Sequence, residues 1–279
     1  MFRHLKPLFM LAGLTLSACG PKTVTKEIGP ESFGGSDQNK SLPMRWAQSS
    51  FPLNMRFSTT FLPDEIAQMR LMRQAWEDQV PEINFFDTGN DTVANNKDND
   101  NLNSFNDGLI GVYFTDPWFQ DVTTNALAIT QFFATTKTQN GEQYFELFHA
   151  DIMVNYQTYD FSINNFASTY DLQSVVLHEV GHLLGLPHNT TAQSVMATSI
   201  APNVQKRSPY AADTASIRNN YAQYLPMQAG QTSVIPAASV SKPASKFKDG
   251  EVVRGIFHQM ASGECHHYIN GELVHTHKK

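Results

Sequence analysis

Hydrophobic residues recur with two different periods along the middle of the chain. In the segment 52–58 every second residue is apolar, as in a strand with one buried face. Short apolar runs predict four more strands, at residues 83–86, 109–114, 126–135 and 144–155. Asn140-Gly141 favours a two-residue turn, so we expect the last two of these strands to form a hairpin.

Other segments have helical spacing. Pro63 is suited to the first position of a helix, and apolar residues follow it at intervals near 3.6 residues. Two more helices are predicted, at 171–184 and 210–224. Strands and helices mixed in this order predict an α+β domain with a mixed sheet.

Two segments show neither period, and they divide the chain. Residues 19–45 are rich in Gly, Pro, Ser, Lys and Thr, which predicts a flexible tether. Residues 226–246 are rich in Pro, Ala, Ser and Gln, which predicts a linker. We therefore expect a main domain at 46–225 and a small unit of strand character at 247–279.

The N-terminal residues 1–18 have the form of a signal peptide. A short basic region precedes a brief apolar run that is too short to span a bilayer. The sequence Leu16-Ser17-Ala18-Cys19 then resembles the lipobox of bacterial lipoproteins, which implies cleavage before Cys19 and lipidation of that cysteine. Gly20 in the next position favours the outer membrane over the inner one. The alternative is an ordinary secretory signal.

Charge and cysteine content narrow the choice of partners. Only 16% of the residues are charged and the net charge is −6, so a basic surface for nucleic acid is not expected. The only cysteines are Cys19 and Cys265. If Cys19 carries lipid, no intrachain disulfide can form, and other interactions must supply the stability.

A metal-binding pattern lies in the predicted helix 171–184. His178 and His182 are four residues apart, so both imidazoles lie on one helix face and can bind one metal ion. Glu179 projects to the side, where it can act as a general base on a water. Gly185 allows the helix to end in a sharp turn, and this turn can bring His188 to the same metal. Three protein ligands with an open position indicate a catalytic Zn²⁺.

Coincidence is the alternative explanation of this pattern. Apolar residues surround the predicted helix on almost all sides, so the helix should be buried. Ionisable side chains on a buried helix need a partner, and a metal ion supplies one.

The pattern His-Glu-x-x-His-x-x-Gly-x-x-His is the signature of the metzincin metalloproteases, and this chain resembles them. Ser194-Val195-Met196 resembles their Met-turn, which implies that Met196 lies beneath the zinc; without that resemblance it would be ordinary core packing. The short gap from His188 to Met196 is most similar to the matrixins, the matrix-metalloproteinase-like branch.

The resemblance also implies a fold. It is a metzincin-like domain with a mixed, mostly parallel twisted sheet, an active-site helix and a C-terminal helix. Residues 148–155 resemble the edge strand ahead of the active-site helix, and residues 213–221 resemble the closing helix. No cysteine-switch pro-domain is visible, which is a departure from the animal enzymes.

These observations lead to two hypotheses. The first is a lipid-anchored zinc endopeptidase of the bacterial cell envelope, with Glu179 as general base. Its protein or peptide substrate would add as a strand to residues 148–155, with a specificity pocket near 195–203. The second is a non-catalytic zinc-containing binding lipoprotein. The presence of Glu179 is an argument against the second, because a structural zinc site needs no base.

Two weaker signals have simpler explanations. The Asn- and Asp-rich segment 89–108 could bind Ca²⁺, but it lacks the spacing of an EF-hand, and a solvated loop is favoured. His149 lies on a predicted strand, and we interpret it as a rim or surface residue.

The C-terminal segment is rich in histidine. Asn270-Gly271 predicts a two-residue hairpin turn that places His266 opposite His275 and Glu264 opposite His277. Those four side chains would share one face and could hold a second metal ion. A solvated polar hairpin is the simpler alternative.

Overall fold

The computed structural model describes residues 42–97, 101–164, 166–226 and 247–277. The predicted signal peptide, Cys19 and nearly all of the tether and linker lie outside these ranges. None of the helices within them is long and apolar enough to cross a membrane.

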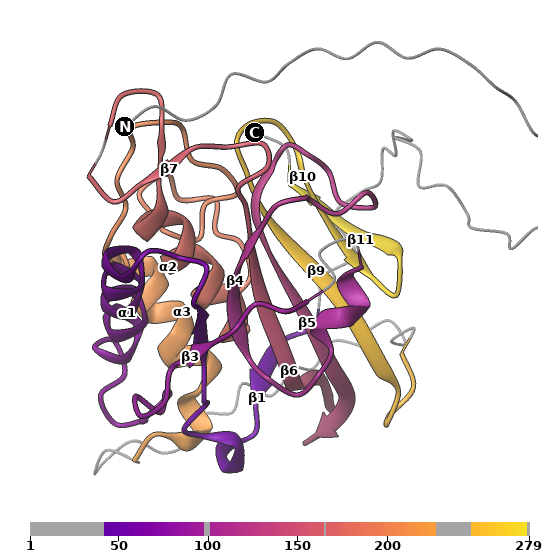
Figure 1. Ribbon diagram of the computed structural model, residues 1–279. Coiled ribbons are helices and arrows are strands. Elements are labelled where there is room, and N and C mark those ends of the chain that lie inside the picture. Colours follow the sequence, from indigo (N-terminus) through magenta and orange to yellow (C-terminus); the bar gives the residue numbers. More distant parts are fainter. Residues whose placement is uncertain (1–41, 98–100, 165, 227–246, 278–279) are drawn as a thin grey trace, which may run out of the picture. The chain divides into compact units, whose positions relative to one another are not determined.

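A nine-stranded mixed sheet organises the described chain (Figure 1). Its strands follow one another in the order β11-β10-β9-β5-β6-β4-β2-β3, and β1 pairs with β6. The strands of this sheet are β1 (Met44–Trp46), β2 (Arg56–Ser58), β3 (Thr92–Val93), β4 (Gly111–Thr115), β5 (Ala126–Gln139), β6 (Glu142–Asn155), β9 (Val252–Met260), β10 (Cys265–Ile269) and β11 (Glu272–His277). A separate two-stranded sheet joins β7 (Phe161–Ser162) and β8 (Tyr170–Asp171).

Parallel and antiparallel pairs occur equally often in this sheet. Within the described chain, four strand pairs are parallel, and they involve β1, β2, β3, β4 and β6. Four are antiparallel, and three of these involve β9, β10 or β11. The predicted α+β class with a mixed sheet is confirmed, and the parallel part of the sheet is extended by an antiparallel C-terminal part.

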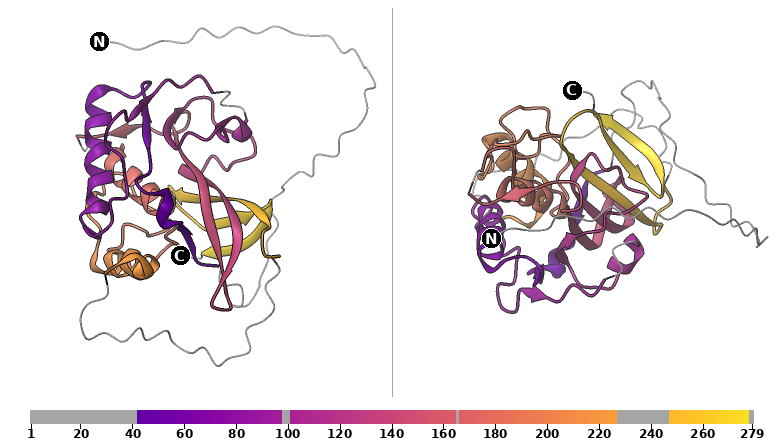
Figure 2. Two further views of the ribbon diagram at one scale, coloured as in Figure 1. Left: turned by 90° about the horizontal axis from the view of Figure 1, so that it is seen from below. Right: turned by 45° about the horizontal axis from the view of Figure 1, so that its top comes forward.

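The helices pack on one side of the sheet (Figures 1 and 2). They are α1 (Pro63–Glu77), α2 (Leu172–Leu183) and α3 (Ala211–Asn220). Short 3-10 turns occur at Gln48–Ser50, Leu102–Phe105 and Ala222–Tyr224, and the second of these packs with Tyr113 in a separate apolar cluster. Pro63 is the first residue of α1, as predicted, and the buried Trp76 near its end donates from Nε1 to the Leu177 carbonyl of α2 at 2.7 Å. This contact fixes α2 against α1 within the main apolar core.

The β5–β6 hairpin forms at the predicted turn. Asn140 and Gly141 both have positive φ, 54° and 78°, and the flanking residues Gln139 and Glu142 are paired. The predicted strand at 83–86 is reduced to a single bridge between Leu53 and Phe86. The apolar residues of this segment pack in the core and do not extend the sheet. Phe85 and Phe86 are both buried, and the ring centroids of Phe85 and Tyr221 are 5.2 Å apart.

The C-terminal residues do not form a unit of their own, which corrects the domain boundaries predicted for 46–225 and 247–279. β9 pairs with β5 from Ala126 opposite Met260 to Thr135 opposite Val252, and β10 and β11 continue the sheet outward. β6 pairs with β5 on one side and with β4 on the other, so the segment 148–155 is internal and is not the predicted edge strand.

Candidate metal centre

Three histidine side chains converge beside the sheet. His178 and His182 lie on one face of α2, and the chain beyond the helix brings His188 to them. Nε2 of His188 lies 3.2 Å from Nε2 of His178 and 3.1 Å from Nε2 of His182. These separations are close to the ~3.3 Å expected between nitrogens that share one tetrahedral Zn²⁺ at 2.0–2.1 Å. The three predicted ligands are therefore brought together.

The turn that returns His188 depends on Gly185. Its φ is +83°, the left-handed conformation predicted for the end of the helix. The Gly185 and Leu186 amides donate to the carbonyls of His182 and Gly181 at 2.8 and 2.9 Å. A Cβ on Gly185 would lie 2.3 Å from the Met44 carbonyl oxygen, so both conformation and space require glycine here.

The second ring nitrogen of each histidine has its own partner. Nδ1 of His178 lies 2.7 Å from the Val195 carbonyl, and Nδ1 of His182 lies 2.7 Å from the Leu186 carbonyl. A carbonyl can only accept, so each of these Nδ1 atoms carries the proton and Nε2 keeps its lone pair. Nδ1 of His188 lies 2.7 Å from Nε2 of His267 in β10. Such partners orient metal ligands and set their tautomers.

Burial keeps these imidazoles neutral. The exposed fractions of His178, His182 and His188 are 0%, 1% and 8%. Burial lowers the pKa of His178 to about 3. Burial, together with the neighbouring histidines, lowers the pKa values of His182 and His188 well below the usual range. The donor set is thus three neutral imidazoles, which fits a catalytic Zn²⁺.

Glu179 lies beside the histidines and is fully buried. Its Oε2 accepts a hydrogen bond from Thr130 Oγ1 of β5 at 2.6 Å. Oε1 makes no regular hydrogen bond to the described residues. Burial raises the pKa of Glu179 to about 8, although the Thr130 hydrogen bond and the nearby Gln259 backbone oppose the rise. The carboxylate has a free oxygen with which to accept a proton.

Met196 lies against the helix at Gly181, between the positions of His178 and His182. It is 1% exposed, and a Cβ on Gly181 would lie 2.3 Å from its sulfur. The buried Asp213 of α3 holds the turn before it, because its carboxylate accepts from Ser194 Oγ and from the Val195 amide at 3.0 Å. Sequence reasoning missed Asp213, although the predicted helix around it was the available signal.

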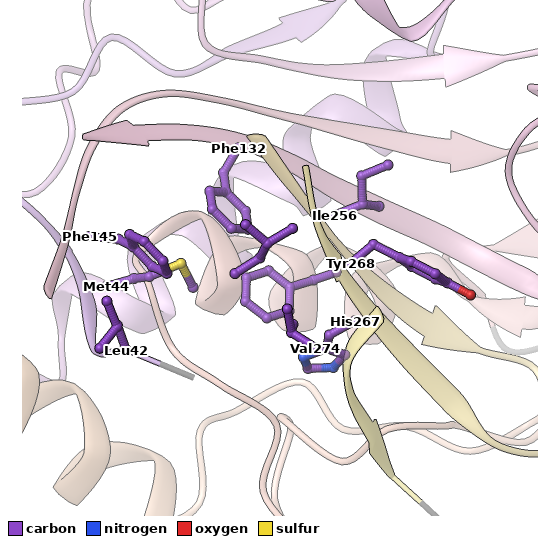
Figure 3. Close-up of a pocket in the computed structure, with 10 residues that line it drawn as sticks. Leu42, Met44, Phe132, Phe145, Ile256, His267, Tyr268 and Val274 are labelled. Atoms are coloured by element: carbon purple, nitrogen blue, oxygen red, sulfur yellow. The ribbon is translucent and has the colours of Figure 1, made fainter. Parts of the chain in front are cut away.

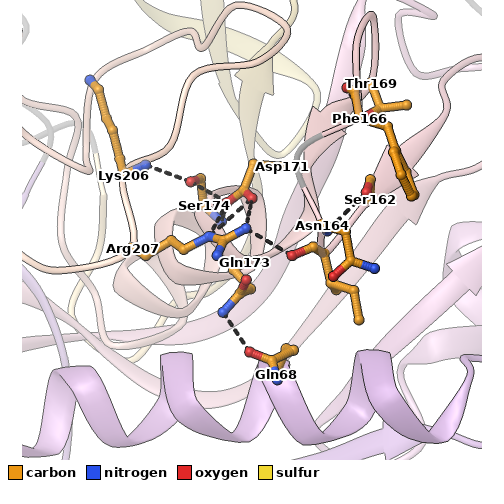
Figure 4. A network of polar contacts seen from close by, with 11 residues as sticks. Gln68, Ser162, Asn164, Phe166, Thr169, Asp171, Gln173, Ser174, Lys206 and Arg207 are labelled. Atoms are coloured by element: carbon orange, nitrogen blue, oxygen red, sulfur yellow. Dashed lines mark hydrogen bonds and ion pairs between the residues drawn. The ribbon is translucent and has the colours of Figure 1, made fainter.

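The start of α2 is fixed by a polar network (Figure 4). Asp171 caps the helix by accepting from the Ser174 amide at 2.9 Å, and Arg207 donates from Nε to the same carboxylate at 3.0 Å. Gln173 reaches across to Gln68 of α1 at 2.9 Å. These contacts set the position of α2 along its axis and so the position of its histidines.

The C-terminal hairpin has a different register from the predicted one. The turn pairs Ile269 with Glu272 as expected, but the register shifts between His267 and Tyr268. This irregularity places His266 opposite Thr276 and His267 opposite His275. A one-residue shift reverses the faces of a strand, so the predicted set of Glu264, His266, His275 and His277 is not assembled. Instead, ring nitrogens of His188, His267 and His277 all lie within 4.8 Å of one another.

The structure also locates the two weaker candidates, His149 and the Asn- and Asp-rich segment 89–108. His149 is 3% exposed, and not at the surface as predicted; its Nε2 lies 2.8 Å from the Phe105 carbonyl and 2.7 Å from Asp151 Oδ2. In the described part of the segment 89–108, Asp91 pairs with Arg70 and Asp107 pairs with Lys97. These carboxylates are used by protein cations, which gives the Ca²⁺ alternative no support.

Comparison with known proteins agrees with the site. Two curated plant proteins match parts of the chain. Metalloendoproteinase 1 of Glycine max is 43% identical over 54 residues, 19% of this chain and 18% of that protein. Metalloendoproteinase 1-MMP of Arabidopsis thaliana is 30% identical over 99 residues, 36% of this chain and 24% of that protein. The matches thus span less than a quarter of either relative.

A solved structure and a family also match. High choriolytic enzyme 1, a hatching enzyme zinc-protease from Oryzias latipes, is 13% identical and is matched over 64% of this chain and 94% of its own. Its TM-score of 0.29 is too low to support a structural argument. Residues 64–222, more than half of the chain, match the matrixin family. The chain therefore belongs to the matrixin family.

Proposed function

We propose that this protein is a zinc-dependent endopeptidase that hydrolyses peptide bonds of extended protein substrates. The observation that carries the proposal is the convergence of three neutral Nε2 atoms beside a buried glutamate on the same helix. The matrixin match over residues 64–222 gives the same indication.

The residues present suit one catalytic Zn²⁺ held by His178, His182 and His188. Bound there, the ion would supply Lewis-acid chemistry by acidifying a water and polarising the scissile carbonyl. Val195 and Leu186 keep the rings of His178 and His182 in the tautomer that leaves Nε2 free to bind. These contacts orient both rings for metal binding.

Glu179 performs the proton transfers. Thr130 holds one carboxylate oxygen at 2.6 Å, so the other, Oε1, is free to accept a proton from the attacking water. The same carboxyl then donates the proton to the amine that leaves.

A non-catalytic zinc-binding lipoprotein remains the alternative of a different class. Such a protein would use the histidines for structure and would need no base. The buried Glu179 argues against it, because burying a carboxylate is costly and only a function compensates for that cost here.

Hydrolysis of casein by the zinc-loaded full chain tests the proposal. We expect cleavage that a chelator stops and that Glu179→Gln lowers by about 10³-fold or more, with zinc content unchanged. In His182→Ala we expect zinc affinity to fall by orders of magnitude, whereas His149→Ala, a buried histidine outside the site, should keep its zinc. Wild type and Glu179→Gln that are equally inert on a broad peptide library would favour the alternative.

We also propose that lipid at Cys19 anchors the protein to the bacterial cell envelope, at the outer membrane. The support is the Leu16-Ser17-Ala18-Cys19 sequence after a basic and an apolar region. Several acyl chains at one site give a stable anchor.

A further inference from the structure

β9 lies beside the metal centre, and its backbone pairs with two walls, strand β5 and the segment 198–200. On one side it runs antiparallel to β5 along its whole length. On the other side its last residue, Met260, pairs in the parallel sense with Ser199: the Met260 amide donates to Thr198 at 2.9 Å, and the Ile200 amide donates to Met260 at 3.3 Å. An extended peptide would use the same main-chain groups to bind there.

The same strand covers the catalytic groups. The ring of Phe257 stacks on that of His182, with centroids 4.3 Å apart and planes 6° from parallel. The backbone of Gln259 lies beside the carboxyl group of Glu179. With His178 and Glu179 both fully buried, no substrate carbonyl can reach them while β9 is in place.

The C-terminal segment is packed here on an apolar surface. Phe257 stacks on Phe132 of β5, with ring centroids 5.3 Å apart. A small apolar pocket lies between β9–β11 and the residues Met44, Phe132 and Phe145, and His267 of β10 is among its lining residues (Figure 3). Nε2 of His267 lies 2.7 Å from Nδ1 of His188. The segment therefore contacts two of the metal ligands directly, His182 and His188.

We propose that β9–β11, residues 252–277, form a cap whose first strand occupies the peptide-binding cleft of the enzyme in place of substrate. The inference rests on the proposed endopeptidase function. In this closed form, the β5 edge and the 198–200 segment are both paired with β9, so a substrate strand has nowhere to bind. Displacement of the cap frees the two walls and exposes Glu179 together.

A disulfide between β5 and β9 can hold the cap closed. Phe133 and Arg254 are opposite one another. The amide and carbonyl of Arg254 both form hydrogen bonds with Asn270 and not with β5. Phe133 and Arg254 are therefore a non-hydrogen-bonded pair of the two strands. In such pairs the Cα atoms are about 4.5 Å apart, which suits a disulfide. We therefore choose Phe133→Cys with Arg254→Cys as the lock and the two single variants as controls.

A substitution that leaves a cavity beneath the cap should favour the open form. Val253 of β9 is fully buried in the main core, and Val253→Ala removes contacts that only the closed cap makes. We expect the open form to become roughly tenfold more populated. Val112→Ala is the matched control, because Val112 is equally buried but lies in β4.

The experiment measures binding and hydrolysis on the zinc-loaded full chain. The binding probe is a fluorescent peptide with the sequence of residues 252–260, followed by anisotropy, and hydrolysis is measured on casein. We expect the oxidised lock to bind no probe and cleave nothing, and a phosphine reductant to restore both. Val253→Ala should raise both about tenfold over wild type, and Val112→Ala should raise neither.

Two results would overturn the cap. One is an oxidised lock that binds the probe as tightly as its reduced form, and the other is a Val253→Ala variant that behaves like Val112→Ala. Probe binding that follows the expected pattern, without cleavage of any peptide by any variant, would instead support the cap and reject the endopeptidase function. The two proposals can therefore fail separately.

Discussion

The ring nitrogens of the metal-site histidines illustrate how single atoms determine chemistry. His178 and His182 each direct Nδ1 to a main-chain carbonyl, whereas His188 directs it to another histidine. A carbonyl fixes the tautomer of its partner, but the second imidazole can accept or donate. Of the three ligands, His188 alone therefore has a tautomer that depends on the C-terminal cap.

Local spacing predicted the ligands and the base because all of them depend on one helix and its terminal turn. It could not predict Thr130, which holds Glu179, or His267, which meets His188, since these contacts join residues 49 and 79 positions apart. No periodicity in the sequence reports pairing at such distances.

Asp91 should make stability depend on acid pH. It accepts hydrogen bonds from Arg70 at 2.7 and 2.8 Å and from Arg73 at 3.2 Å. The Arg70 hydrogen bond outweighs burial and lowers the pKa of Asp91 below its usual value. A lowered pKa in the folded state stabilises the protein above the unfolded pKa of about 3.9, and this contribution is lost as the pH falls through the folded value.

We expect Asp91→Asn to reduce the free energy of unfolding at pH 7 by about 2–3 kcal/mol, below the cost for a fully buried pair because Arg70 is partly exposed. The difference from wild type should shrink below about pH 4. Urea unfolding at pH 7 and pH 3 measures both values, with the exposed Asp64→Asn as control. A loss that is the same at both pH values would show that the ion pair is not its cause.

At the scale of elements, residues at the two ends of α2 determine its position. Asp171 and Gly185 define where the helix starts and stops. The sequence predicted the helix boundaries and the role of Gly185, but the capping role of Asp171 was not predicted. The hairpin at Asn270-Gly271 shows the limit of such signals. Its turn was predictable, but the irregularity between His267 and Tyr268 was not, because it results from packing on β9 and His188 and not from a turn residue.

Gly185→Ala should destabilise the protein by about 3 kcal/mol, through backbone strain and overlap with the Met44 carbonyl. It should also weaken zinc binding, because His188 follows the same turn. Gly141→Ala is a matched control, since Gly141 has φ +78° with nothing within 4 Å of an added Cβ; we expect it to cost only about 1 kcal/mol. Thermal unfolding measures the stability of both variants. An equal loss of stability in Gly185→Ala and Gly141→Ala would contradict the steric argument.

At the scale of the whole molecule, the predicted fold class was correct and the predicted division of the chain was not. The composition of residues 226–246 suggested that the C-terminal residues 247–279 form a separate unit. Yet β9 pairs with β5 more than a hundred residues earlier in the chain, and this long-range pairing determines the domain. Apolar and polar patterning can identify β9 as a strand, but it does not say which strand it joins.

Membrane anchoring through Cys19 is also a property of the whole chain. Cys19→Ser should leave the protein without lipid and move it from the membrane fraction to the soluble fraction. Cys265→Ser changes the only other cysteine and should leave the distribution unchanged. Fractionation after a high-salt wash distinguishes the two, and Cys19→Ser retained with the membranes would refute lipid anchoring.

The pairing of β5 with β9 also bears on self-association. β5 is 14 residues long, and its first nine residues are all buried. Without β9 it would present a long apolar edge with unpaired backbone groups, which is a template for aggregation. In the closed form the edge is β11, which is short, partly exposed and includes Glu272, His275 and His277. A molecule that displaces the cap must therefore pair with β5 itself. Otherwise the exposed edge of β5 is expected to pair with a second copy of this chain.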